Sequence, residues 1–80
     1  MSLREQIIAE MKKREDKQKE AFGELFSREA FAWYCTWWFK FSIPKTTAEI
    51  RRELEKMERE KIVKSDREQS NNTKWMLVAE

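Results

Sequence analysis

Apolar residues at the start of the chain follow the spacing of an α-helix. They share one helical face: Leu3, Ile7, Ile8 and Met11. Ser2 and Glu5 can form a capping box in front of this stripe. The charged run over residues 12–20 contains no apolar side chain and continues the helix as a solvated surface. Gly23, the single glycine of the chain, is a suitable helix stop, so the pattern predicts a helix over residues 1–22.

A second helical stripe lies in the middle of the chain. It consists of Ile50, Leu54 and Met57. Thr46 and Glu49 can form a capping box at its start, and Pro44 prevents an earlier helix from continuing into it. The pattern predicts a helix over residues 46–60. The face opposite the stripe carries small or basic side chains: Lys45, Ala48, Arg52, Lys56 and Arg59.

The segment between these stripes, REAFAWYCTWWF, is the most apolar part of the chain. Four of its residues fall at the i, i+3, i+4 and i+7 positions of one face: Phe31, Tyr34, Cys35 and Trp38. This spacing predicts a third, mostly buried helix over Arg28–Phe39, with Ser27 as its N-cap. Most of the rings are expected in the core. In the alternative, Trp33 or Trp37 stays exposed as a partner-binding patch.

Two short β-prone runs follow the second stripe. Residues 62–63 and 75–78 are apolar, and residues 64–74 between them are polar and rich in turn-forming types. The pattern predicts that residues 62–64 pair antiparallel with residues 74–78. A purely helical bundle is the alternative, and it requires both runs to be non-β.

A helix that leads directly into a long hairpin resembles the second half of a winged helix-turn-helix domain. The residues that carry the resemblance follow the order of such domains: Thr47, Ile50, Arg51, Arg52, Leu54, Met57, Glu58, Arg59, Ile62 and Val63. It covers about Ser27–Val78 and implies a mostly helical α+β fold of three helices followed by a C-terminal β-hairpin wing. Residues 1–80 would then form one domain, with the helix-turn-helix over 27–60 and the wing over 61–79.

Two positions refine the resemblance. Residues 24–26 are either a short strand that pairs with the terminal hairpin, as in many winged helices, or a linker. Lys61 stands where many members have glycine. It either adopts the left-handed conformation at some cost, or the helix ends in another way.

Composition limits the chemistry that the chain can perform. Histidine is absent and Cys35 is the single cysteine, which excludes an intrachain disulfide and a zinc site of Cys and His ligands. Without histidine no catalytic constellation stands out, so we expect neither enzymatic activity nor a metal or cofactor. No apolar run approaches the roughly 20 residues of a membrane span. We therefore expect a soluble, cytoplasmic protein.

The winged-helix resemblance implies binding to double-stranded DNA and a role in transcriptional regulation, typical of small phage or prophage proteins that act as homodimers. The implied DNA contacts come from the helix and the wing: Lys45, Thr46, Thr47, Ala48, Arg51, Arg52, Lys56, Lys64, Arg67 and Lys74, with Asn71 and Asn72 beside the last three. The net charge of +2 requires the charges to be sorted in space. The alternative function is a protein-protein interaction module, an adaptor or inhibitor, on the same scaffold.

Overall fold

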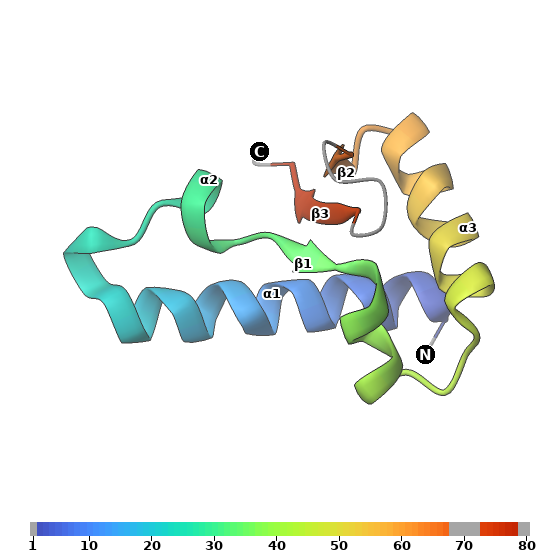
Figure 1. Ribbon diagram of the computed structural model, residues 1–80, viewed down its shortest axis with the longest axis horizontal. Coiled ribbons are helices and arrows are strands. Elements are labelled where there is room, and N and C mark those ends of the chain that lie inside the picture. Colours follow the sequence, from blue (N-terminus) through green and yellow to red (C-terminus); the bar gives the residue numbers. More distant parts are fainter. Residues whose placement is uncertain (1, 68–72, 79–80) are drawn as a thin grey trace.

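The computed structural model describes residues 2–67 and 73–78. Their elements, in chain order, are α1 (Leu3–Phe22), η1 (Gly23–Leu25), α2 (Arg28–Phe31), β1 (Tyr34–Cys35), η2 (Thr36–Phe41), α3 (Thr47–Arg59), β2 (Val63–Asp66) and β3 (Lys74–Leu77). The structure is α+β. The long helix α1 runs along one side of the sheet, and α3 lies at the end of α1 where the chain begins (Figure 1). Within the described residues, every helix is too short or too polar to cross a lipid bilayer.

Both helices predicted from stripes are confirmed, together with the residues that start them. The Oγ of Ser2 accepts a hydrogen bond from the Glu5 N–H, and the Glu5 carboxylate accepts one from the Ser2 N–H. α1 ends at Gly23, whose φ of 52° lies in the region that side chains disfavour. The local rules for helix ends therefore apply to both ends of α1. Ser27 stands at the N-cap position of α2 as predicted, but its side chain makes no capping hydrogen bond.

The predicted aromatic helix over Arg28–Phe39 is wrong. α2 ends at Phe31, Tyr34–Cys35 form the strand β1, and a 3₁₀ helix, η2, follows. A continuous helix here would be apolar on nearly every side, with no face suited to water. Tryptophan, tyrosine and threonine also fit an extended strand well. Pairing with β3 satisfies backbone groups that would otherwise stay unpaired. The free energy of this long-range pairing outweighs the local preference for a helix that the spacing of the apolar residues indicates.

The sheet has three antiparallel strands in the order β1-β3-β2. Val63 pairs with Leu77 and Lys64 with Met76, which confirms the predicted hairpin and rules out the purely helical bundle. Tyr34 pairs with Trp75 on the other edge of β3. Residues 23–25 form a 3₁₀ turn, so the strand that joins the hairpin lies about ten residues later than the sequence alternative placed it.

The core joins α1, η2, α3 and the hairpin. Its largest fully buried side chains are Trp75, Phe39, Ile7, Ile50, Leu54, Met57, Met76 and Val63. The buried Trp75 indole N–H donates to the Thr36 hydroxyl at 2.7 Å, and that hydroxyl donates to the Thr73 carbonyl at 3.0 Å. The large ring is therefore buried without an unsatisfied polar group.

Candidate nucleic-acid interface

α3 has a defined start and stop, which fix the direction of its side chains. The Thr46 hydroxyl accepts from the Glu49 N–H at 3.1 Å, and the Glu49 carboxylate accepts from the Thr46 N–H at 3.2 Å. At the other end, Lys61 adopts φ 63°. Its N–H donates to the Glu58 carbonyl at 3.0 Å, and the Ile62 N–H donates to the Met57 carbonyl at 2.8 Å. This is a Schellman motif with lysine at the position that glycine usually occupies.

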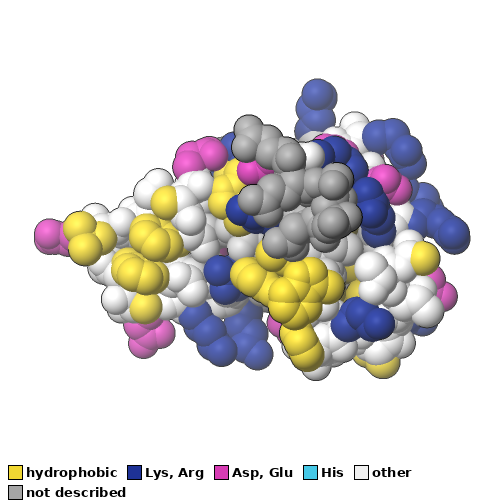
Figure 2. All heavy atoms as spheres, viewed as in Figure 1, with side chains coloured by type: hydrophobic (Ala, Val, Ile, Leu, Met, Phe, Trp, Pro, Cys, Tyr) yellow, Lys and Arg dark blue, Asp and Glu magenta, His cyan; other side chains and the backbone are white. Residues whose placement is uncertain are grey.

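The two faces of α3 have opposite characters. The predicted stripe of Ile50, Leu54 and Met57 is fully buried because α3 packs against α1 and η2. The opposite face is exposed and carries Ala48, Arg52, Lys56 and Arg59, with Lys45 just before the helix. Lys and Arg side chains dominate the right-hand edge of the molecule, over α3 (Figure 2).

Two acidic side chains, from Glu53 of α3 and from its C-cap residue Glu60, bind one arginine of α1. Arg4 donates to Glu53 at 2.9 Å and to both carboxylate oxygens of Glu60, at 3.0 and 2.7 Å. The hydrogen bonds that Arg4 donates to Glu60 and then to Glu53 raise the pKa of Arg4. The same contact with Arg4 is the main reason that the pKa of Glu60 is lowered. A single guanidinium from α1 thereby holds both carboxylates in charge-assisted hydrogen bonds and compensates one of their two negative charges.

A third acidic side chain of α3 binds the hairpin. Glu58 accepts from the Ser65 hydroxyl and, at 2.9 Å, from the Arg67 guanidinium. The hydrogen bond from Ser65, more than that from Arg67, lowers the pKa of Glu58 against the opposing effect of burial. Glu58 is therefore ionised at neutral pH and keeps its hydrogen bonds to Ser65 and Arg67, which connect the end of α3 to the hairpin.

The outward basic face keeps a net positive charge after these pairs are counted. Glu49 is held in the capping box, and Glu55 lies 4.0 Å from Arg51. Within residues 2–67 and 73–78, Arg52, Lys56 and Arg59 form no ion pair with a carboxylate. The charge sorting that the near-neutral composition demanded is therefore present on α3.

Comparisons with protein-family models, curated proteins and solved structures find no match to this chain. The interpretation of α3 accordingly rests on its geometry and charges.

The structure divides the hairpin residues of the predicted site between two faces of the sheet. Arg67 lies beside Glu58 of α3, with its guanidinium 5.2 Å from the centre of the Trp75 ring. Lys64 binds Glu29 at 2.8 Å and lies 6.0 Å from the Trp33 ring. Arg67 therefore adjoins α3, whereas Lys64 lies toward α2.

Lys74 belongs to the same sheet face as Lys64. It is half-buried and pairs across the sheet with Cys35 and with Asp66, and side chains directly opposite each other share a face. Lys64 pairs with Met76, two residues further along β3. Lys64 and Lys74 are therefore not gathered with the basic face of α3. Asn71 and Asn72 lie outside the described residues.

Sequence reasoning placed the basic residues of α3 and missed Arg4, the residue that pairs with Glu53 and Glu60 beside them. Arg4 lies 49 residues from Glu53 and 56 from Glu60. In the sequence it is one charged position among many, and no local pattern marks it as a partner of α3. The periodicity of α3 could show only that Glu53 lies on its flank.

The single thiol is placed where it is inert. Cys35 is buried in β1, and burial raises the pKa of its thiol against the weaker opposing influence of Lys74 and Arg14. A raised pKa keeps the less reactive thiol form. Among the described residues, no three His, Cys, Asp or Glu side chains gather as a metal site would require.

Proposed function

We propose that this chain is a small winged-helix protein that binds double-stranded DNA, with α3 in the major groove. The observation that carries the proposal is the outward face of α3, where Arg52, Lys56 and Arg59 stand free of ion pairs among the described residues. Glu53 of the same helix and its C-cap residue Glu60 are held by Arg4, and Glu58 is held by the hairpin. A helix face of this kind favours a polyanion.

The order of the elements supports the winged-helix part of the proposal. A strand precedes the last two helical segments, η2 and α3, and pairs with the second strand of the terminal hairpin. The resemblance allowed a strand that pairs with the hairpin at residues 24–26, whereas the strand that pairs with it is Tyr34–Cys35. In the proposal η2 takes the place of the second helix of the helix-turn-helix, and β2 with β3 forms the wing.

The proposed contacts follow from the positions on α3. The small side chain of Ala48 lets the helix backbone approach the groove. Arg52 and Arg59 are seven residues apart on one face, about 10 Å along the helix axis, so they reach successive features of the groove. Arg52 is suited to guanine or to phosphate. Lys45 and Thr46 lie at the helix N-terminus, where phosphates are favoured.

The remainder of the proposal concerns regulation. We infer a transcriptional regulator of the phage type, located in the cytoplasm, that binds two half-sites as a homodimer, because one minimal domain offers few base contacts. Arg67 would exchange Glu58 for a phosphate at the edge of this interface. Lys64 and Lys74, on the other sheet face, are not part of it.

The test is a fluorescence titration of labelled duplex pools at two salt concentrations. We expect Arg52→Ala to weaken binding by about 1–3 kcal/mol with relaxed sequence preference if Arg52 reads a guanine. If Arg52 contacts only a phosphate, the loss is uniform across sequences and the salt slope falls by about one. Arg59→Ala should weaken binding in one of the same two ways.

Lys19→Ala is the matched control because it removes one exposed positive charge at the far end of α1 (Figure 1). It should leave duplex affinity within about twofold, a difference under roughly 0.5 kcal/mol. Equal losses of duplex affinity for Arg52→Ala and Lys19→Ala would show that binding depends on the overall charge of the protein and not on the face of α3. No binding of folded wild type to any duplex at low salt would overturn the proposal.

The second candidate function is a protein-interaction module. The observation in its favour is a pair of exposed aromatic rings, Trp37 and Phe41, which lie on η2 and not on α3.

A further inference from the structure

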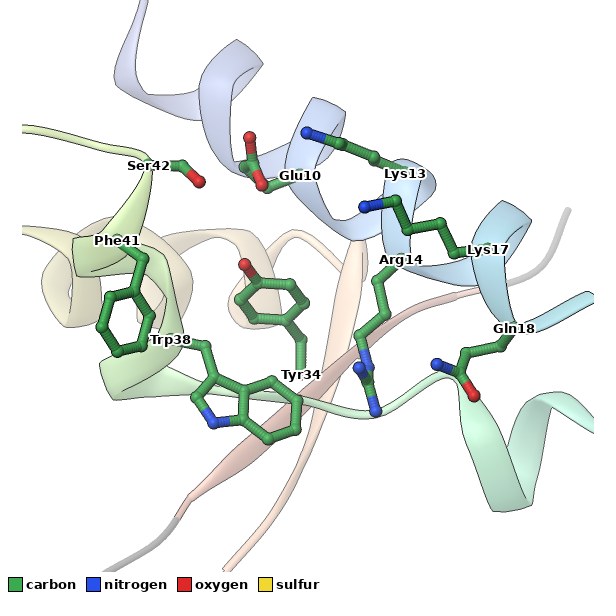
Figure 3. A pocket seen from close by; sticks show the side chains of 9 residues that line it. All are labelled: Glu10, Lys13, Arg14, Lys17, Gln18, Tyr34, Trp38, Phe41 and Ser42. Carbon is green, nitrogen blue, oxygen red and sulfur yellow. The ribbon is translucent and has the colours of Figure 1, made fainter. Parts of the chain in front are cut away.

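A groove lies between α1 and the segment that contains η2. Its volume is about 310 Å³. Figure 3 shows the two walls: one consists of side chains from successive turns of α1, and the other of Tyr34, Trp38, Phe41 and Ser42. No residue of α3, β2 or β3 lines it. It is therefore a site separate from the candidate DNA interface.

The aromatic wall is held in place by its own contacts. The Arg14 guanidinium lies 4.5 Å from the centre of the Trp38 ring and donates to the Trp33 carbonyl at 2.8 Å. Tyr34 meets Trp38 edge to face, with ring centres 5.4 Å apart. Figure 3 shows the Tyr34 hydroxyl pointing toward the part of α1 that carries Glu10. The wall is therefore preorganised before any partner arrives.

The outer lip of the groove is apolar and exposed. Phe41, which lines the groove, is 79% exposed. Its neighbour Trp37, outside the lining, is 49% exposed, and the two ring centres lie 5.8 Å apart in an edge-to-face arrangement. In Figure 2, hydrophobic side chains gather over β1 and η2, with Lys and Arg side chains beside them. Large rings exposed together beside a groove are typical of interaction surfaces.

The wall on α1 is basic. Lys13 and Lys17 are exposed one turn apart, and within residues 2–67 and 73–78 neither forms an ion pair with a carboxylate. With Arg14 they give three positive charges against one negative charge, Glu10, in the groove lining. That local excess of two equals the net charge of the entire chain, so the groove attracts an acidic partner.

We propose that this groove binds a short acidic peptide segment of a partner protein, with one apolar side chain against Trp38 and Phe41 and its carboxylates on Lys13 and Lys17. The wall from residue 10 to residue 18 extends about 12 Å along α1, which matches three to four extended residues. The proposal does not depend on DNA binding by α3.

The aromatic geometry favours a peptide over single-stranded nucleic acid. The Arg14 guanidinium lies over the Trp38 ring, and the Tyr34 and Trp37 rings stand at 78° and 75° to it. Stacking of successive bases requires open ring faces that follow the strand. Here neighbouring rings are steeply inclined to one another beside a hollow, which suits a compact side chain such as leucine or phenylalanine.

The experiment is a fluorescence-anisotropy titration of a labelled octapeptide with a central Leu-Phe pair and three acidic residues on each side. One control peptide has Ser-Ser in place of the apolar pair, and another has Asn and Gln in place of the acids. An unlabelled oligothymidine of twelve nucleotides serves as competitor. We expect the first peptide to bind about tenfold more tightly than either control.

Two matched pairs of variants test the residues. Phe41→Ser should weaken peptide binding about tenfold, whereas Leu25→Ser, at an apolar residue 78% exposed outside the groove, should not change it. Lys13→Glu should weaken it several-fold at low salt and less at high salt. Lys12→Glu, the neighbouring exposed lysine outside the groove lining, should have the smaller effect. Thermal unfolding of each variant confirms that it is folded.

Each outcome decides the proposal. The proposal is supported if peptide binding depends on Phe41 and Lys13 and on both the apolar pair and the acidic residues of the peptide. The same variants should leave the affinity for duplex DNA unchanged. The absence of binding up to about 1 mM peptide, a free energy weaker than roughly 4 kcal/mol, overturns the proposal. Equal effects of the paired variants also overturn it, as does displacement of the peptide by oligothymidine at lower concentration than by unlabelled peptide, which would make the groove a nucleic-acid site.

Discussion

Lys61 adopts a left-handed backbone conformation that a lysine disfavours. A non-glycine residue at φ 63° costs about 1 kcal/mol relative to glycine in the left-handed region. The conformation persists because it lets two amides reach the last carbonyls of α3, at 3.0 and 2.8 Å. It also directs Ile62 and Val63 into the hairpin. The ordered neighbours on both sides of Lys61 therefore determine its backbone.

Lys61→Gly should increase the free energy of unfolding by about 0.5–1 kcal/mol. Glycine removes the clash of the Cβ atom, and only part of that gain is lost to the greater freedom of the unfolded chain. Urea denaturation of both proteins measures the change. Lys61→Ala is the control, because it shortens the side chain but keeps the Cβ atom. A glycine variant no more stable than the alanine variant would contradict a strained helix stop.

At the scale of elements, α3 and the aromatic segment differ in what determines them. The apolar residues of α3 are confined to one face, and its charged residues lie on the other. A single orientation of the helix therefore buries the apolar residues and leaves the charged residues in water. The aromatic segment has apolar side chains in every direction. Its conformation depends on which backbone groups need partners, and β3 provides them through Tyr34 and Cys35.

Leu54→Ala tests the phase of α3. Leu54 is fully buried where α3 packs on the remainder of the core, so we expect a loss of about 2–5 kcal/mol in the free energy of unfolding. A loss of this size approaches the total stability of a domain of 80 residues. Leu25→Ala, at a residue 78% exposed, should change it by less than about 0.5 kcal/mol. A loss below about 1 kcal/mol at Leu54 would contradict the described core.

At the scale of the whole molecule, long-range ion pairs sort the charges. Arg4 of α1 holds the carboxylates of Glu53 in α3 and of its C-cap residue Glu60, and Arg67 after β2 holds that of Glu58. Individually such surface pairs contribute little stability. Together they move negative charge away from the outward face of α3. The molecule thereby presents a basic surface although its composition is nearly balanced.

The pair between Glu58 and the hairpin predicts a dependence of stability on pH. The pKa of Glu58 is lowered in the folded protein, first by Ser65 and then by Arg67. Glu58 therefore makes its full contribution to the free energy of unfolding above its pKa in the unfolded chain, about 4.3. That contribution is lost as the pH falls through its lower pKa in the folded protein. Between pH 7 and pH 3, Glu58→Gln should lose less stability than wild type, because glutamine has no proton to gain.

The control for this measurement is Glu24→Gln. Glu24 is exposed in η1 and forms no ion pair within the described part of the chain, so its variant should follow the wild-type curve. Thermal unfolding followed by circular dichroism at several pH values gives the comparison. Identical slopes for wild type and Glu58→Gln would show that the Glu58 contact does not form in solution.

The sequence by itself determined the parts of this protein that depend on neighbours within a few positions. Ser2 with Glu5 and Thr46 with Glu49 start the two long helices, and Gly23 stops the first. The stripe on α3 identified its buried face, and two β-prone runs separated by a polar stretch identified the hairpin. Caps, helical faces and short β-prone runs are local, so they can be read before the fold is known.

Tertiary structure alone decided the aromatic segment and the positions of the charges. Tyr34 and Cys35 became a strand because β3, forty residues away, had an edge to pair. Arg4 became the partner of Glu53 and Glu60, and Lys64 was drawn to Glu29 on the other side of the sheet. Hydrogen bonds and ion pairs between distant residues form only after the chain brings them together, and their free energy then outweighs the weaker local preferences.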